Sequence, residues 1–194
     1  MLPRLAAATA LAAILCPPAH ADPLSLRLPS SGGVVAIGWG EVSGGYWVDP
    51  HLGFEVDATL PGTVGIAAGT RGRVGGVFGL DFGIAGGPTL DIGVPAVGLQ
   101  VAPWVDFAVR TPVLLDLGVV LPGQVGLTVF GATWSAPLLL EGSVAVALGP
   151  VRLGLWGNVG ATVQARSWTV DGNGGLWLGV GKENREKGRT HQTK

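Results

Sequence analysis

The sequence predicts an all-β chain, folded as an antiparallel, up-and-down transmembrane β-barrel of eight to twelve strands with short turns. The composition is the first observation: 47% of the 194 residues are hydrophobic and 13% charged, with 34 Gly and 14 Pro. Long helices are unfavourable here, because inside a helix each Gly costs about 1 kcal/mol and each Pro about 3 relative to Ala. The second observation is a period-two alternation of apolar and small or acidic residues along the chain.

The third observation is the distribution of charge. Residues 22–181 include eleven acidic residues and six arginines, but no lysine; every lysine lies in residues 182–194. A water-soluble domain of this size usually covers its surface with Lys and Glu. The outer surface of residues 22–181 is therefore expected to face something other than water. The net charge of −1 for the chain gives no nucleic-acid footprint, so no nucleic-acid partner is expected.

Residues 1–21 are expected to be a cleaved signal peptide. Arg4 supplies a positive start, residues 5–16 form a short apolar run, and Ala19-His20-Ala21 is an A-x-A cleavage site. A lipoprotein leader is the alternative, because Cys16 follows apolar residues, although Leu15 stands where lipid attachment prefers a small residue. Cleavage after Ala21 would remove the only cysteine, so neither a disulfide nor a thiolate site is expected in the mature chain.

The strands of the barrel domain, residues 22–181, are predicted from their alternation. Leu52, Phe54, Val56 and Leu60 fall on one face of a strand, while Glu55 falls with its polar neighbours on the other. The same pattern recurs in residues 74–84, 113–121, 138–148 and 151–164. Each run is close to the roughly 9 to 11 residues that a tilted strand needs to cross a bilayer. Residues 24–28 are expected to form a short first strand.

Turn signals separate these runs and predict consecutive hairpins. They are Asp49-Pro50-His51, Pro61-Gly62, Arg71-Gly72-Arg73, Gly86-Gly87-Pro88, Thr111-Pro112, Pro122-Gly123, Ser135-Ala136-Pro137, Gly149-Pro150 and Asp171-Gly172-Asn173-Gly174. In residues 89–109 the apolar parity switches at Pro95, which indicates either a turn or a bulge. The charged residues 182–194 lack apolar side chains and are expected to form a disordered tail.

Two architectures fit alternating hairpins. A soluble β-sandwich buries its apolar faces, whereas a membrane barrel turns them outward and leaves no unpaired edge in lipid. The lysine-free body favours the barrel, as does a second face made of Gly, Ala and isolated acids. The seven tryptophans stand mainly near segment ends, where an interfacial aromatic girdle would form, although core packing explains any single one equally well.

One segment resembles a known family. Residues 44–56 read GGYWVDPHLGFEV, which is similar to the strand–turn–strand signature of the OmpA-like transmembrane domain, and residues 175–181 (GLWLGVG) resemble its final strand. The resemblance covers about twenty residues and implies an outer-membrane barrel with a periplasmic turn at Asp49-Pro50-His51. The connections here are shorter than that family's extracellular loops. The family's final strand also ends in an aromatic residue, whereas this chain continues into the charged tail.

Candidate functional residues lie on the face that the barrel would turn inward. The lumen or gate candidates are Glu55, Asp57, Asp81, Asp116, Glu141 and Arg152; Asp91 and Asp106 share the face, and Arg110 and Arg166 stand near strand ends. The resemblance places Glu55 in a lumen salt-bridge network, and Arg152 is its candidate partner. Buried charges must pair, hold water or take up protons. The interpretations left open are a polar filling that closes the barrel and a narrow ion path, which the excess of acids would make cation-preferring.

Catalytic and metal motifs are absent. No H-E-x-x-H, C-x-x-C or G-x-S-x-G pattern occurs, and His51 is the only histidine in residues 22–181. No enzymatic activity, catalytic residue, metal or cofactor is therefore expected. The sequence predicts an outer-membrane β-barrel of a Gram-negative bacterium, either structural or a narrow pore. Its expected partners are outer-membrane lipid, the barrel-assembly and periplasmic chaperone machinery, and ions in the lumen. The alternatives are a surface adhesin or opacity-type interaction protein, a soluble periplasmic β-protein and, least favoured, a lipid-modifying barrel enzyme.

Overall fold

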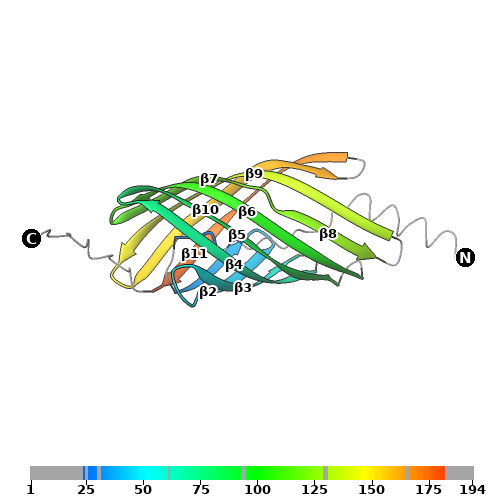
Figure 1. Ribbon diagram of the computed structural model, residues 1–194, viewed down its shortest axis with the longest axis horizontal. Coiled ribbons are helices and arrows are strands. Elements are labelled where there is room, and N and C mark those ends of the chain that lie inside the picture. Colours follow the sequence, from blue (N-terminus) through cyan, green and yellow to red (C-terminus); the bar gives the residue numbers. More distant parts are fainter. Residues whose placement is uncertain are drawn as a thin grey trace, which may run out of the picture.

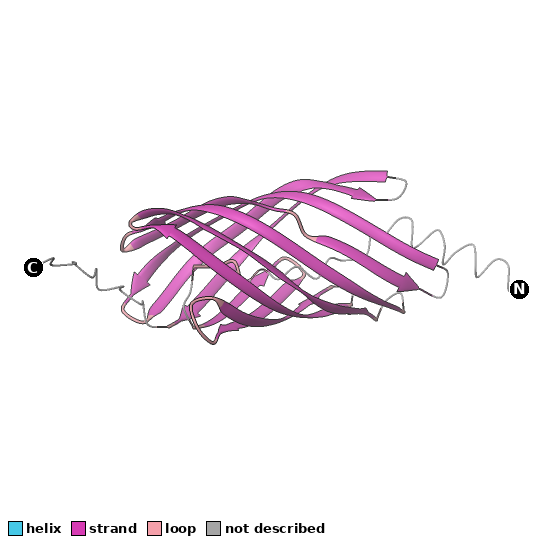
Figure 2. Ribbon diagram, in the orientation of Figure 1, coloured by secondary structure: helices cyan, strands magenta, loops and turns pink. Residues whose placement is uncertain are grey.

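A computed structural model describes residues 24, 26–29, 32–60, 62–92, 95–128, 131–164 and 167–181. The expected signal peptide, the charged tail and Arg166 lie outside these residues. The regular elements described are all β-strands (Figure 2). No helix among the described residues is long and apolar enough to cross a membrane.

Eleven strands follow one another along the described chain. They are β1 (Gly33–Gly38), β2 (Glu41–Trp47), β3 (Leu52–Thr59), β4 (Thr63–Gly75), β5 (Phe78–Asp91), β6 (Ala96–Arg110), β7 (Val113–Val120), β8 (Gly123–Thr128), β9 (Gly131–Leu148), β10 (Val151–Gln164) and β11 (Ser167–Val180). Each pairs antiparallel with its sequence neighbours, apart from β7 and β8, and β11 pairs with β1 to close the sheet (Figure 1). The predicted antiparallel up-and-down barrel is therefore confirmed.

Strands β7 and β8 occupy a single position in the wall. Both pair with β6 on one side and β9 on the other, in the same register before and after the break at Leu121 and Pro122. Pro122 has no amide hydrogen to donate to the ladder, which explains the interruption. The Leu121 amide still donates to the Pro103 carbonyl (3.0 Å), so the wall continues and has ten positions.

Four of the expected turns lie inside strands instead. Residues 71–73, 86–88, 135–137 and 171–174 belong to β4, β5, β9 and β11, whereas Pro122-Gly123 marks the break between β7 and β8. On β4, Gly72 serves for close packing rather than for turning. A Cβ there would come 2.5 Å from the Phe82 ring on the neighbouring strand. The ambiguous Pro95 does mark a turn, since β5 ends at Asp91 and β6 begins at Ala96.

The two ends of the barrel differ. We call the end at which β1 begins and β11 ends the terminal end. The opposite end, called the distal end, carries the β1–β2, β3–β4, β5–β6, β8–β9 and β10–β11 connections (Figure 1). The β1–β2 connection is tight and uses Gly40 at φ 75°, a conformation that favours glycine. Strands lengthen from six residues in β1 to 18 in β9. The distal rim is therefore slanted, and residues 167–174 of β11 extend beyond the register that pairs with β1.

The faces of the wall have the predicted polarity. Phe54, Leu117 and Leu153 point outward and are 49%, 62% and 54% exposed. Asp57 and Asp116 are buried inside the barrel. A soluble β-sandwich would show the opposite arrangement.

The tryptophans divide into two groups. Trp39, Trp134 and Trp168 are exposed at distal positions, as a girdle requires, but Trp47, Trp104, Trp156 and Trp177 are buried inside the barrel. Each interior indole lies against an inward glycine, where a Cβ would come within 3 Å of the indole: the pairs are Gly53 with Trp47, Gly83 with Trp104, Gly38 with Trp156 and Gly154 with Trp177. The expectation of a girdle was wrong for these four, because the glycines provide the space that their rings fill.

Candidate functional site

The six lumen candidates lie on five strands and all face the interior. Glu55 and Asp57 come from β3, Asp81 from β5, Asp116 from β7, Glu141 from β9 and Arg152 from β10. Each is buried, with no more than 8% of its surface exposed. Asp106 on β6 is buried beside them. All lie in the half of the barrel next to the terminal end, so alternation alone gathers charges from distant parts of the sequence.

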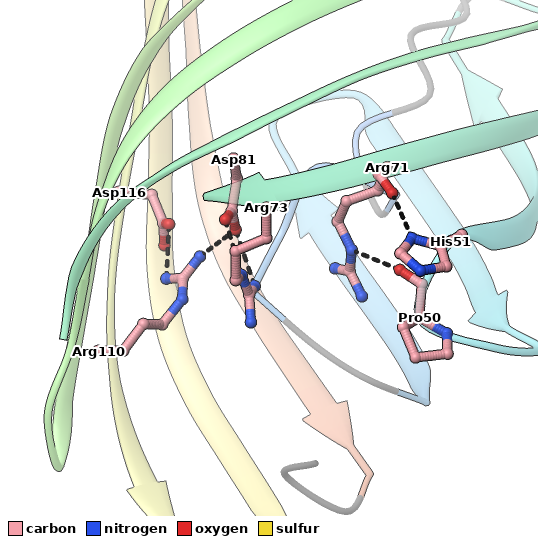
Figure 3. A network of polar contacts seen from close by, with 7 residues as sticks. All are labelled: Pro50, His51, Arg71, Arg73, Asp81, Arg110 and Asp116. Carbon is pink, nitrogen blue, oxygen red and sulfur yellow. Dashed lines mark hydrogen bonds and ion pairs between the residues drawn. The ribbon is translucent and has the colours of Figure 1, made fainter. Parts of the chain in front are cut away.

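Arg110 is the centre of a charged network in this half (Figure 3). Its guanidinium donates to Asp116 (2.6 Å) and also to Asp81. Arg73 binds Asp81 through two further hydrogen bonds of 2.7 and 2.8 Å, and Ser143 donates to Asp116 (3.2 Å). The network thus joins β4, β5, β6, β7 and β9, and satisfies two carboxylates that would be costly to bury alone.

Arg71 forms a second cluster nearby (Figure 3). Its guanidinium carbon lies 3.9 Å from the centroid of the buried Trp47 ring, a cation–π arrangement. Its Nε donates to the Pro50 carbonyl (3.5 Å), while His51 Nδ1 donates to the Arg71 carbonyl (3.0 Å). His51 thereby fastens the β2–β3 connection to β4, which is a structural use of the one histidine in the predicted barrel domain.

The interior also holds a segment of the chain itself. Leu24, Leu26, Arg27 and Leu28 are buried, although none belongs to a strand. The prediction of a first strand at residues 24–28 is therefore wrong. The alternating leucines lie inside the lumen and do not form a strand of the wall. Leu24 and residues 26–29 are called the plug below.

Two acids of the wall bind the plug. The Leu26 amide donates to Glu55 Oε2 (3.0 Å). Arg27 makes a two-point ion pair with Glu141, with Nη2–Oε2 at 2.5 Å and Nε–Oε1 at 3.3 Å. The proposed pairing of Glu55 with Arg152 stays a prediction, whereas the hydrogen bond from the plug to Glu55 is present in the structure.

Sequence reasoning undercounted the cations of the interior. Besides Arg152, the charged half of the described barrel holds Arg27, Arg71, Arg73 and Arg110, so positive and negative side chains are nearly balanced there. Arg71 and Arg73 share the inward parity of Ala67 and Gly69. That parity was the signal that could have found them, but the glycine between them was interpreted as a turn.

The distal half of the interior is polar and mostly uncharged. Gln124 donates to Thr89 (3.1 Å), and Asn173 donates to Glu41 (2.9 Å). The buried side chains of Thr59, Thr63 and Gln100 have no hydrogen-bond partner within the described part of the chain, so water must satisfy them. Glu41 and Asp91 have inward parity in this half, as does Asp171 in the exposed distal part of β11, and no described arginine joins them.

One small cavity lies in this half. It has a volume of about 30 Å³ and is lined by residues that include Thr89, Asp91, Gln124 and Ser135. Such a volume holds a few water molecules at most. No large ligand fits this cavity.

The geometry defines a class: a closed β-barrel with an apolar exterior, a charged interior and an internal plug. The described residues include no group of three or more His, Cys, Asp or Glu side chains that could hold a metal ion. Comparison with known protein families, with curated proteins and with solved structures found no match.

Proposed function

We propose that this protein is a bacterial outer-membrane β-barrel that serves as a structural or narrow-pore protein and has no enzymatic activity. The observation that carries the proposal is the inside-out polarity of the wall. Large apolar side chains on every strand face outward and are exposed, while the acids and arginines face inward. A surface of this kind is unfavourable in water but is suited to the hydrocarbon of a bilayer.

The dimensions of the longest strand support a membrane location. The outward residues of β9 between Trp134 and Leu148 are mostly apolar. At about 3.3 Å per residue and a tilt of about 40°, this stretch rises about 35 Å along the barrel axis. The hydrocarbon core of a bilayer is about 30 Å thick. Strand β9 is thus long enough to cross it.

Exposed aromatic residues lie toward both ends of the wall. Trp134 and Trp168 lie near the distal ends of β9 and β11, and Tyr46 and Phe78 lie at the terminal ends of β2 and β5. Trp and Tyr favour the lipid–water interface. This distribution supports a barrel oriented across the membrane, and the resemblance of residues 44–56 supports a periplasmic terminal end. Export by a cleaved signal peptide and folding by the periplasmic chaperone and barrel-assembly machinery belong to the same proposal.

The distal half of the lumen favours cations. Glu41 and Asp91 contribute negative charge there, whereas the acids of the terminal half are nearly balanced by arginines. A ring of acids attracts cations into a narrow pore. The pore is therefore proposed to be cation-preferring because of its distal half.

The test starts with the full-length protein expressed in bacteria. It should fractionate with the outer membrane, resist extraction by aqueous buffer, and migrate differently on a gel before and after boiling, because only boiling unfolds a closed barrel. Extraction into buffer alone with unchanged mobility would contradict a membrane location.

The pore is tested next in planar bilayers. Openings should show a reversal potential of cationic sign in a KCl gradient, and replacing Glu41 by Gln together with Asp91 by Asn should reduce it. Asp49→Asn is the matched control, because it removes a charge from a connection outside the lumen. A protein that inserts into the bilayer but shows no openings would contradict the pore and support the structural role. Anion selectivity would contradict the cation preference.

A further inference from the structure

We propose that the plug, Leu24 and residues 26–29, is a releasable gate: while it occupies the terminal half of the lumen the path is closed, and its withdrawal opens it. This inference rests on the proposed function, since a gate requires a barrel in a membrane. It goes further by naming the segment that blocks the path and the acids that hold it.

The apolar side chains of the plug pack against two different sets of wall residues. Leu24 and Leu28 pack in one buried cluster with Trp156 and Trp177, and Leu26 packs in another with residues that include Trp47 and Trp104. The fit around Leu26 is close: a Cβ on Gly53 or Gly69 would come 2.7 or 2.9 Å from its methyl groups. The two glycines form a notch in the wall that receives this leucine, so the plug blocks the lumen at this point.

Polar contacts join the plug to two strands of the wall. The Arg27 amide donates to the Leu24 carbonyl (3.0 Å), which curls the segment into a turn. The Leu26 amide binds Glu55, and the Arg27 guanidinium binds Glu141. The plug is thus held by side chains of β3 and β9 and is not paired with any strand of the wall.

The wall closes without help from the plug. Six residue pairs between β1 and β11, from Gly33 with Val180 to Gly38 with Gly175, complete the ring of strands. Withdrawal of the plug therefore breaks no strand pairing. The plug is attached to the start of β1 at the terminal end, so it can leave toward that side while the barrel stays closed.

The space that the plug vacates would be lined by more acids than arginines. Glu55 and Glu141 would lose their contacts with the plug, and Asp57 and Asp106 are buried close by on β3 and β6. A carboxylate left without a counter-charge in a poorly hydrated interior is costly. Water and permeant cations entering the lumen would compensate Glu141 when Arg27 leaves, which couples opening to cation entry.

The experiment measures single-channel currents of the full-length protein in planar bilayers with KCl. Arg27→Ala removes the ion pair and should raise the open time by roughly tenfold or more, because the closed state loses a buried, two-point contact. The charge swap Arg27→Glu with Glu141→Arg restores the pair in reverse and should return the open time toward the original value. Asp49→Asn removes a charge from the exposed β2–β3 connection, outside the lumen, and serves as the control.

A reversible covalent lock tests the same point by a second route. Arg27→Cys with Glu141→Cys, bridged by a short bifunctional methanethiosulfonate reagent, should abolish openings, and dithiothreitol should restore them. The two single-cysteine proteins treated with the reagent are the controls.

The outcomes separate the two proposals. A protein that never enters bilayers and shows no heat-dependent gel mobility overturns the proposed function. A protein that inserts and shows that mobility shift, but whose openings are the same when locked, reduced or mutated at Arg27, overturns the gate alone. In that case the plug is a fixed part of the interior.

Discussion

Arg73 on β4 and Asp81 on β5 stand directly opposite each other in the register of the sheet and form a two-point ion pair. The pair lies near the mouth of the terminal end, where the Arg73 side chain is 46% exposed. Deeper in, Asp81 is also bound by Arg110, whose side chain is only 12% exposed. One carboxylate is thus held by a solvated arginine and by a largely buried one.

This difference in exposure predicts that replacing Arg110 costs more stability than replacing Arg73. Arg110→Met should lower the free energy of unfolding by about 3 kcal/mol, because it leaves the carboxylates of Asp81 and Asp116 buried without their shared cation. Arg73→Met should cost about 1 kcal/mol or less, since exposed ion pairs contribute little. Urea unfolding in detergent micelles, followed by tryptophan fluorescence, measures both. Equal costs would contradict the central position of Arg110.

The glycine–tryptophan pairs predict a second contrast. A Cβ on Gly38 would come 2.5 Å from the Trp156 ring, whereas one on Gly44 of the adjacent strand would lie 3.9 Å from its nearest neighbour. Gly38→Ala should therefore destabilise the barrel by about 1 to 3 kcal/mol through overpacking, and Gly44→Ala should change little. The temperature at which gel mobility converts to that of the boiled form compares the two variants. A stable Gly38→Ala protein would show that the Trp156 ring has free space to move.

The alternation of residues was sufficient to predict the wall. Phe54 against Glu55 and Asp57 gives the outward and inward faces of β3 from sequence alone, because the side-chain period of a strand is two. The same rule placed Arg152 and Glu141 inside. It also applied to Trp156, which shares the parity of Arg152, although for any single tryptophan an interfacial girdle and interior packing were equally open from the sequence.

The plug could not be predicted in this way. Leu24, Leu26 and Leu28 alternate as a strand does, and only the tertiary structure distinguishes a strand in the wall from a segment inside it. Hence Arg27, the cation that binds Glu141, was missing from the candidate site. Local patterns do not record which residues distant in sequence surround a segment.

The β2–β3 connection predicts a pH dependence. Asp49 accepts hydrogen bonds from the amides of His51 (2.6 Å) and Leu52 (2.8 Å). These two hydrogen bonds hold the pKa of the Asp49 carboxyl below its ordinary value of 3.8, and the bond from the His51 amide has the larger effect. Because the folded pKa is the lower one, the contribution of Asp49 to stability is complete above the ordinary value and is lost as pH falls through the depressed one.

Carboxyl-carbon NMR of the protein in micelles should therefore place the Asp49 titration midpoint below 3.8. Asp49→Asn keeps the acceptor oxygen but cannot titrate, so its unfolding should be less sensitive to acid over the same pH range. A midpoint at or above the ordinary value would show that the two amide bonds do not persist in solution.

The proposed membrane location predicts how an added charge depends on depth. Leu140 and Leu148 are both outward residues of β9, one near the middle of the stretch from Trp134 to Leu148 and the other at its terminal end. In liposomes, Leu140→Arg should lower the free energy of unfolding by about 2 to 4 kcal/mol and Leu148→Arg by about 1 or less, because the cost of a charge falls from the bilayer midplane to the interface. Denaturant titration of the folded fraction measures the difference. If the two substitutions lower the free energy of unfolding by the same small amount, the outer surface of β9 faces water. A bilayer would then not explain the inside-out polarity of the wall.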